Sequence, residues 1–199
     1  MIRLVVFLIL IFPSFQFASS KLISSVASES LSIYAGETGI RGLSDTLLYR
    51  PSALAINQIG EILIADTYNN RVVKKDANGH LQSVTPPDVM NSPYGCAFDS
   101  RSNLYICDYR NHMIHRLDLS SGTMRPFAGT GFKNSCGRGS FNGDGHEALK
   151  TSISFPHGIA CDGLDNVYFS DSGNHRVRKI DFNTNVRYYF IPHTHSHKQ

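Results

Sequence analysis

The sequence predicts an all-β repeat protein, and two observations predict it. Three stretches align without a gap over 26 residues each, at 51–76, 93–118 and 156–181. Each begins with Pro and carries Asp and then Asn at the same offsets, as Asp66 and Asn69 do in the first copy. Self-similarity at a period of about 40 residues is typical of proteins built from stacked repeats. Outside the N-terminal leader, no run of ten or more residues has the apolar period of a helix.

Each copy reads as four short strands. A small apolar run follows the Pro, a polar turn follows the run, and a second apolar run ends at the repeated Asp. A third strand comes after the repeated Asn, and a fourth strand with less regular alternation closes the unit. The predicted first strands are 53–56, 95–98 and 158–161, the second 62–65, 104–107 and 167–170, the third 71–75, 113–117 and 176–180, and the fourth 81–84, 123–127 and 186–191. Four antiparallel strands in a repeated unit form a β-propeller blade.

The repeated strings carry a family resemblance. The third copy reads PHGIACDGLDNVYFSDSGNHRVRKID, with Asn174-His175 ahead of its third strand, and the second copy has Asn111-His112 there. Together with the first copy, these strings resemble successive NHL repeats, named for an Asn-His-Leu triplet, over roughly residues 31–191. The resemblance implies an NHL-type β-propeller of the secreted type. Its repeats would span 51–84, 93–127 and 156–191.

Three blades are fewer than the four to eight that close a propeller ring. We therefore expect three four-stranded blades forming an open arc, which is a partial six-bladed propeller. Each end of such an arc would expose a large apolar face of the kind that drives self-association. A head-to-head pair of chains, a truncated gene product and an open arc each account for the blade number, and truncation is the interpretation we favour.

Four segments lie outside the repeats. Residues 1–20 combine a positive start, a nine-residue apolar run and small residues before Lys21, which is typical of a secretory signal peptide. The apolar run is far shorter than the ~20 residues needed to span a bilayer. We therefore expect a secreted, extracellular protein without stable membrane insertion. The other segments are a linker at 21–30, an insert at 132–155 and a His-rich tail at 192–199.

The net charge argues against nucleic acid as a partner. The formal charge is +3, and it falls to +2 once the leader with Arg3 is removed. Such a weak excess does not provide the positive patch that nucleic-acid binding needs. Basic residues do recur in the third strands, where long side chains can lie along a blade edge and keep their charge in water. The residues that we assign to this solvated edge are Arg71, Lys74, Lys75, Arg116, Arg176, Arg178 and Lys179.

Four cysteines suit an oxidising compartment but are too few for a disulfide scaffold. If the hairpin turn is centred between Arg101 and Ser102, Cys96 and Cys107 lie directly opposite each other. Directly opposite Cβ atoms are about 4.5 to 5.5 Å apart, slightly more than a disulfide requires. A cross-strand disulfide and a pair of buried thiols both remain open on the sequence alone.

No metal site or cofactor is expected. The segment 142–147 of the insert supplies only two carboxylates and lacks the alternation of a calcium loop, so a polar turn is favoured over a cation site. His193, His195 and His197 would share one side of an extended chain, where neutral imidazoles can bind zinc or copper. A polar tail is the interpretation we favour there.

The repeated polar residues are interpreted as structural, because a group present once in every blade is more economically a building device than a catalytic one. We expect the carboxylates to accept hydrogen bonds from the N–H groups of the turn that follows. These residues are Asp66, Asp108 and Asp171, with Asn69, Asn111 and Asn174. Residues that break the repeat are better candidates for a binding surface. They are Tyr68, Tyr109, Arg110 and His157.

These observations predict a secreted NHL-repeat scaffold that binds a protein or a glycan and performs no catalysis. Stacked repeats create extended surfaces without needing an active site, and no Ser-His-Asp order, paired carboxylates or phosphate-binding loop stands out. The resemblance also implies an alternative, because six-bladed relatives include amidating lyases and lactonases. On that alternative, the chain is a fragment of a metal-dependent propeller enzyme whose functional residues converge on the central channel.

Overall fold

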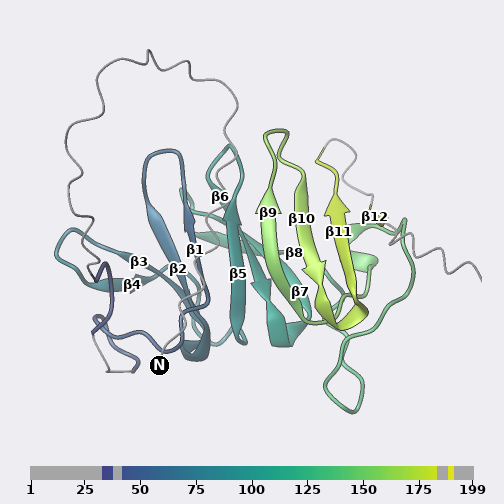
Figure 1. Cartoon of the computed structure of the whole chain (residues 1–199), viewed down its shortest axis with the longest axis horizontal. Coiled ribbons are helices and arrows are strands. Elements are labelled where there is room, and N and C mark those ends of the chain that lie inside the picture. The colour runs from purple at the N-terminus through teal and green to yellow at the C-terminus, as the bar shows by residue number, and fades with distance from the viewer. Residues whose placement is uncertain (1–32, 38–41, 183–187, 191–199) are drawn as a thin grey trace, which may run out of the picture. The chain divides into compact units, whose positions relative to one another are not determined.

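The computed structural model describes residues 33–37, 42–182 and 188–190, and in these residues it contains three four-stranded antiparallel sheets. Figure 1 shows the first strands of the sheets, β1, β5 and β9, side by side. Blade 1 consists of β1 (Ala53–Ile56), β2 (Ile62–Asp66), β3 (Arg71–Lys75) and β4 (Leu81–Ser83). Blade 2 consists of β5 (Pro93–Phe98), β6 (Asn103–Asp108), β7 (Met113–Asp118) and β8 (Thr123–Ala128). Blade 3 consists of β9 (Pro156–Cys161), β10 (Val167–Asp171), β11 (Arg176–Ile180) and β12 (Tyr188–Phe190).

The predicted all-β fold with four strands in each repeat is confirmed. Neighbours in each sheet are consecutive along the chain, so every blade is a simple up-and-down meander. The first strands of blades 2 and 3 begin earlier than predicted, at the repeated prolines Pro93 and Pro156. Both prolines lie at the start of an innermost edge strand, where the missing N–H group costs no ladder hydrogen bond. The predicted leader, linker and His-rich tail lie outside the described residues.

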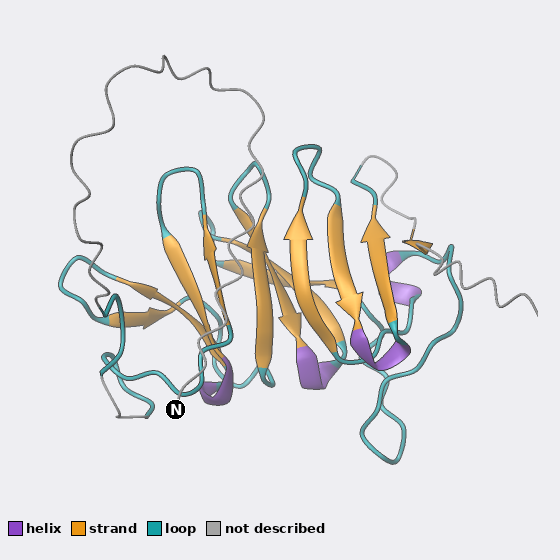
Figure 2. Cartoon of the chain, in the orientation of Figure 1, coloured by secondary structure: helices purple, strands orange, loops and turns teal. Residues whose placement is uncertain are grey.

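Short 3-10 turns mark one end of the blades. They follow the second strand of each blade, as η1 (Thr67–Asn69), η2 (Tyr109–Asn111) and η4 (Ser172–Asn174), and Figure 2 shows them along the lower edge of the view. We call this end the turn end, and the opposite end, where the first two strands of each blade are joined, the hairpin end. Among the described residues, no helix is long and apolar enough to cross a bilayer.

Apolar clusters fill the spaces between neighbouring blades. Leu63 of β2 and Leu104 of β6 belong to the cluster between blades 1 and 2. Tyr105 of β6 and Phe169 of β10 belong to the cluster between blades 2 and 3. Because β6 has a neighbouring blade on both sides, all of its residues are buried, which explains the apolar run at 104–107 between Asn103 and Asp108. We call the face of a blade toward the preceding blade its leading face, and the face toward the following blade its trailing face.

The insert between blades 2 and 3 is partly built into the core. Its second half forms a single 3-10 turn, η3 (Ala148–Lys150), and continues into β9. Ala148 and Ile153 are buried in the cluster between these blades. The insert is therefore not only a surface loop, because its C-terminal part supplies apolar side chains that close the space between two blades.

The predicted pairing of Cys96 with Cys107 is wrong by one residue. The hairpin pairs Cys96 with Ile106, and a register shift between Pro93 and Cys96 displaces the pairing further along β5. A shift of one residue moves a side chain to the other face of a strand. Cys96 therefore lies in the cluster on the leading face of blade 2, whereas the Cys107 thiol lies 3.9 Å from the Gly158 carbonyl oxygen of blade 3. Both are free, buried thiols.

Glycine is required where the inner strands approach most closely. A Cβ atom on Gly95 of β5 would lie 2.3 Å from the His157 carbonyl oxygen of β9. Gly158 occupies the same offset in blade 3, but a Cβ atom there would meet only the Ser170 hydroxyl, at 3.6 Å. The two glycines occupy the same position in their repeats. The inner strand of the next blade lies beside Gly95, whereas no further blade lies beside Gly158 in the described residues.

We therefore predict that Gly95→Ala lowers the free energy of unfolding by about 2 kcal/mol or more, because the backbone of β9 must shift to make room. Gly158→Ala should change it by less than about 1 kcal/mol. Urea unfolding of the two variants beside the unchanged protein measures both values. Equal losses in the two variants would contradict the role assigned to the β5–β9 contact.

Candidate functional site

A buried aspartate fixes the turn end of every blade. Its Oδ1 atom accepts the backbone N–H of the residue two positions before the repeated Pro, and the carbonyl of that same residue accepts a backbone N–H from the 3-10 turn. The Asp-to-N–H distances are 2.7 Å for Asp66 and Tyr49, 2.8 Å for Asp108 and Asn91, and 2.6 Å for Asp171 and Ser154. The loop entering each inner strand is thus held at two points against the turn that leaves the second strand.

The other carboxylate oxygen binds side chains of the same blade. Oδ2 accepts a hydrogen bond from the amide of the repeated Asn, at 2.8 Å for Asn69, 2.8 Å for Asn111 and 2.9 Å for Asn174. The sequence predicts that the N–H groups of the following turn bind the aspartate. Those N–H groups reach backbone carbonyls instead, because the entering loop lies between the turn and the carboxylate.

A basic residue of the third strand completes each of these groups. Arg71 Nε lies 2.8 Å from Asp66, His115 Nε2 lies 3.1 Å from Asp108, and Arg178 Nη1 lies 3.2 Å from Asp171.

Arg178 is only 1% exposed, so its predicted place on a solvated edge is wrong. It also binds Asp144 of the insert at 2.8 Å. Burial of this charge is supported by two carboxylates and by carbonyl acceptors at Ser152 and Gly143.

Neighbouring blades are joined at the turn end by one further recurring contact. The residue that follows η1, η2 and η4 has a left-handed backbone, and in blades 1 and 2 its side chain reaches the next blade. Asn70 Oδ1 accepts the backbone N–H of Ser92 at 2.8 Å, and His112 Nδ1 accepts the backbone N–H of Phe155 at 3.0 Å. We call this the inter-blade cap, because it satisfies the N–H group of the residue just before the repeated Pro.

Four aromatic rings gather at the turn end around the inner strands of blades 2 and 3. Tyr94 of β5 lies 4.8 Å from Tyr109 of η2 and 4.5 Å from His157 of β9, measured between ring centroids. Tyr109 lies 4.9 Å from Phe155 and 6.1 Å from His157. We call these four residues the aromatic cluster. The buried His112 packs against this cluster, with its ring centroid 4.5 Å from that of Phe155.

A second aromatic group continues this surface over blade 1. Tyr68 of η1 lies 5.2 Å from Tyr49, and the Arg50 guanidinium lies 4.9 Å from the centre of the Tyr68 ring. Arg50 also donates a hydrogen bond of 3.2 Å to the Tyr68 hydroxyl. Tyr94 connects the two groups: burial raises its pKa, and the nearby hydroxyls of Tyr68 and Tyr109 raise it further.

The structure brings together the four sequence-predicted binding candidates at the turn end. Tyr109 and His157 belong to one cluster, Tyr68 belongs to the adjoining group, and Arg110 is the exposed neighbour of Tyr109 in η2.

Sequence reasoning missed Tyr94, Phe155, Tyr49 and Arg50. The repeats contained a signal for three of them: Tyr94 follows the repeated Pro, as His157 does, and Arg50 and Phe155 directly precede it. In both places the copies differ, which is the criterion that selected the other candidates.

Electrostatics at the cluster favour neutral imidazoles. Burial lowers the pKa of His157 and of His112, and for His112 the opposing effect of the Gly137 carbonyl, which its Nε2–H contacts at 3.0 Å, is smaller. A neutral His112 with its proton on Nε2 leaves Nδ1 free to accept the Phe155 N–H. The surface is therefore aromatic and uncharged at its centre, with the exposed cations Arg50 and Arg110 beside it.

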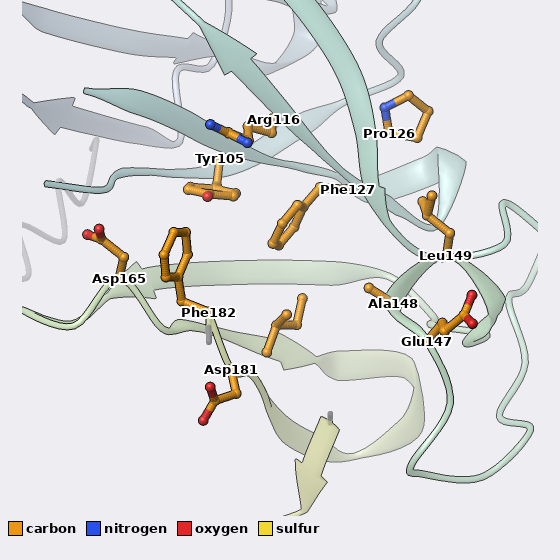
Figure 3. Close-up of a pocket in the computed structure, with 11 residues that line it drawn as sticks. Tyr105, Arg116, Pro126, Phe127, Glu147, Ala148, Leu149, Asp165, Asp181 and Phe182 are labelled. Carbon is orange, nitrogen blue, oxygen red and sulfur yellow. The ribbon is translucent and has the colours of Figure 1, made fainter. Parts of the chain in front are cut away.

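A groove of about 470 Å³ lies at the other side of the molecule, between the outer strands of blades 2 and 3. Figure 3 shows the rings of Tyr105, Phe127 and Phe182 at its centre and Asp165 and Glu147 at its edges.

The edge carboxylates of this groove already have partners. Asp165 accepts two hydrogen bonds of 2.8 Å from Ser100, and Glu147 pairs with Lys150 at 3.0 Å. The groove is therefore a weaker candidate site than the aromatic cluster.

The polar segment of the insert also has internal partners. Asp144 binds Arg178, Asn142 Oδ1 accepts the Ser152 N–H at 2.8 Å, and the Asn142 side-chain amide donates to the Lys150 carbonyl at 2.9 Å. These contacts form an ordered polar turn packed against blade 3. In the part of the chain that the structure describes, no group of three or more His, Cys, Asp or Glu side chains is placed to hold a metal ion.

Four-stranded blades, each with a buried Asp at its turn end and two of them with an Asn-His pair, are those of an NHL-repeat β-propeller. The family model of the teneurin NHL domain matches residues 28–198, and the chain belongs to this family. It is also similar to NHL repeat-containing protein 2 of Bos taurus, with 28% identity over 129 residues, which are 56% of this chain and 18% of that protein. The Homo sapiens protein of the same name shows 28% identity over 123 residues, 53% of this chain and 17% of that protein.

Solved structures with the same fold include two enzymes. A gluconolactonase from Xanthomonas campestris superposes with a TM-score of 0.53 at 15% identity, covering 73% of this chain and 48% of that one. Virginiamycin B lyase from Staphylococcus aureus gives a TM-score of 0.50 at 15% identity, covering 70% and 40%. The chain thus spans less than a fifth of the curated relatives and less than half of these propellers, and the similarity to the enzymes concerns the fold.

The inter-blade cap predicts a pH dependence of stability. Because the folded-state pKa of His112 lies below its unfolded value, the cap stabilises the fold above pH ~6.5 and its contribution is lost as the pH falls. His112→Asn replaces the imidazole by the residue type that serves blade 1 as Asn70. We expect the free energy of unfolding to fall less steeply between pH ~7 and ~5 in this variant.

Chemical unfolding at several pH values measures that slope. His80→Asn is the matched control, because His80 is exposed, takes no part in a cap and pairs with Asp76 only at the surface. It should change the slope less than His112→Asn does. A slope that is the same in His112→Asn as in the unchanged protein would disprove the assignment.

Proposed function

We propose that this NHL-repeat propeller is a secreted scaffold without catalytic activity, which binds a protein ligand through the aromatic surface of its turn end. The observation that carries the proposal is the convergence of the residues that break the repeat. They come from all three blades, and they adjoin at one end of the inner strands rather than being scattered over the surface.

The composition of this surface supports a protein ligand. Tyrosine and arginine are enriched among the residues that dominate binding energy in protein interfaces. Tyr68 is 43% exposed and is stacked by Arg50, and Arg110 and His157 are exposed beside it. The rings lie against one another at tilted angles, so they form a preorganised surface whose side chains lose little further freedom on binding. A glycan is the alternative ligand, and the experiment below distinguishes the two.

Secretion is supported by the leader-like composition of residues 1–20, which lie outside the described residues. The absence of catalysis is supported by the kind of residue that breaks the repeat, because these are aromatic and arginine side chains rather than paired carboxylates. The enzymes with the same fold share too little sequence to transfer their activities, since function lies in sites and not in folds.

The proposal predicts that Tyr68→Ala and Arg110→Ala each weaken ligand binding by about 2 kcal/mol, roughly 30-fold in Kd, as expected of the tyrosine and arginine side chains that dominate binding energy in an interface. A panel of purified extracellular domains and a glycan array identify the ligand class, and surface plasmon resonance measures the Kd. Both side chains are exposed, so the variants should unfold at the same urea concentration as the unchanged protein.

Leu164→Ala is the matched control, because Leu164 is a large exposed side chain at the hairpin end. It should leave the Kd unchanged. Binding that is insensitive to both turn-end variants would place the ligand elsewhere. Turnover of lactones or amidated peptides by protein with stoichiometric zinc or calcium would replace the scaffold by the enzyme alternative.

A further inference from the structure

The inner strands carry side chains of different size on their two faces. Leading faces are larger: Leu54 and Ile56 in β1, Cys96 and Phe98 in β5, Ile159 and Cys161 in β9. Trailing faces are small: Ala53 and Ala55 in β1, Gly95 and Ala97 in β5, Gly158 and Ala160 in β9. At both junctions inside the structure, a larger leading face therefore packs into a small trailing face, which lets the inner strands approach closely.

Two inner-strand faces have no neighbour in the described residues. On the leading face of blade 1, Leu54 is 62% and Ile56 is 56% exposed. The segment before β1 covers the outer part of this face, because Ala35 and Leu48 pack against the cluster of Ile64, Val73 and Leu81. It leaves the β1 part uncovered. On the trailing face of blade 3, Gly158 and Ala160 are exposed.

The inter-blade cap is also incomplete at these same two places. His175 is the blade 3 equivalent of Asn70 and His112 and has the same left-handed backbone, but its exposed imidazole contacts no acceptor or donor in the described residues. Arg50 is the blade 1 equivalent of Ser92 and Phe155, and its backbone N–H has no acceptor in the described residues. One end therefore presents the acceptor of a cap, and the other end presents the donor.

We infer that the trailing face of blade 3 docks onto the leading face of blade 1 of a second copy of this chain. Leu54 and Ile56 of one copy would pack against Gly158 and Ala160 of the other, and His175 would accept the Arg50 N–H, which repeats both contacts seen at the internal junctions. Two copies of three blades give six, which lies within the range of closed propellers. A head-to-tail pair related by a two-fold axis forms this junction twice and leaves neither face uncovered.

The test uses the mass of the purified chain by sedimentation and light scattering, at concentrations up to about 100 µM so that mass action favours a dimer. The unchanged chain should show a doubled mass. Leu54→Asp and Ala160→Arg, one on each face, should each weaken the dimer at least roughly 30-fold, because each places an unpaired charge in the junction. Both side chains are exposed, so the folded monomer should survive, as circular dichroism would show.

An equimolar mixture of the two variants gives the sharper result. In a mixed pair, one junction is unchanged and the other brings the two opposite charges together, so the doubled mass should return. Ile59→Asp is the control, since Ile59 is exposed in the β1–β2 hairpin away from both faces, and it should leave the dimer intact.

A monomeric unchanged chain would overturn the inference and indicate that further blades of a longer polypeptide cover these faces. Equal weakening by Leu54→Asp and Ile59→Asp, or failure of the mixture to restore the dimer, would also overturn it.

Discussion

The buried aspartate of each blade is the interaction on which the turn end depends. A carboxylate removed from water is destabilising unless its oxygens are hydrogen-bonded, and Asp66, Asp108 and Asp171 are fully buried. Each is satisfied by the loop before the inner strand, the Asn of the 3-10 turn and a basic side chain of the third strand. One buried charge therefore fixes three segments of a blade relative to one another. Because the same arrangement recurs, the loops and turns of all three blades are set in the same way.

This constraint separates the positions that build a blade from those that are free to vary. The Asp and Asn side chains are committed to these hydrogen bonds, whereas the side chains on either side of the repeated Pro and in the first two positions of the 3-10 turn take no part in them. The copies differ in sequence at these positions. Tyr94, Tyr109 and His157 occupy such positions. A surface for recognition can thus be assembled on the propeller without disturbing the contacts that hold its blades together.

The sequence predicted the strands well because a buried strand leaves a local signal, an apolar run ended by a turn. It predicted the candidate surface only in part. Tyr68 and Tyr109 stand out within their own repeats, but Phe155 stands just outside the aligned stretch and contacts Tyr109 from another blade. The Cys96 register failed for a different reason, since a shift within β5 changes the pairing without changing the apolar pattern. The sequence predicts Arg178 to lie in water because its partner Asp144 belongs to the insert, outside any repeat.

In a repeat protein, a comparison of equivalent positions also points to contacts made outside the described residues. A glycine at 95 is explained by the strand beside it, since a Cβ atom would meet the β9 backbone. Within the described residues, the glycine at the same offset in blade 3 has no such neighbour, and neither does the left-handed His175. A lone blade would gain from a larger side chain at 158, which would cover apolar surface and restrict the unfolded chain. Small residues on one end face and large ones on the other are therefore better explained by a junction than by solvent.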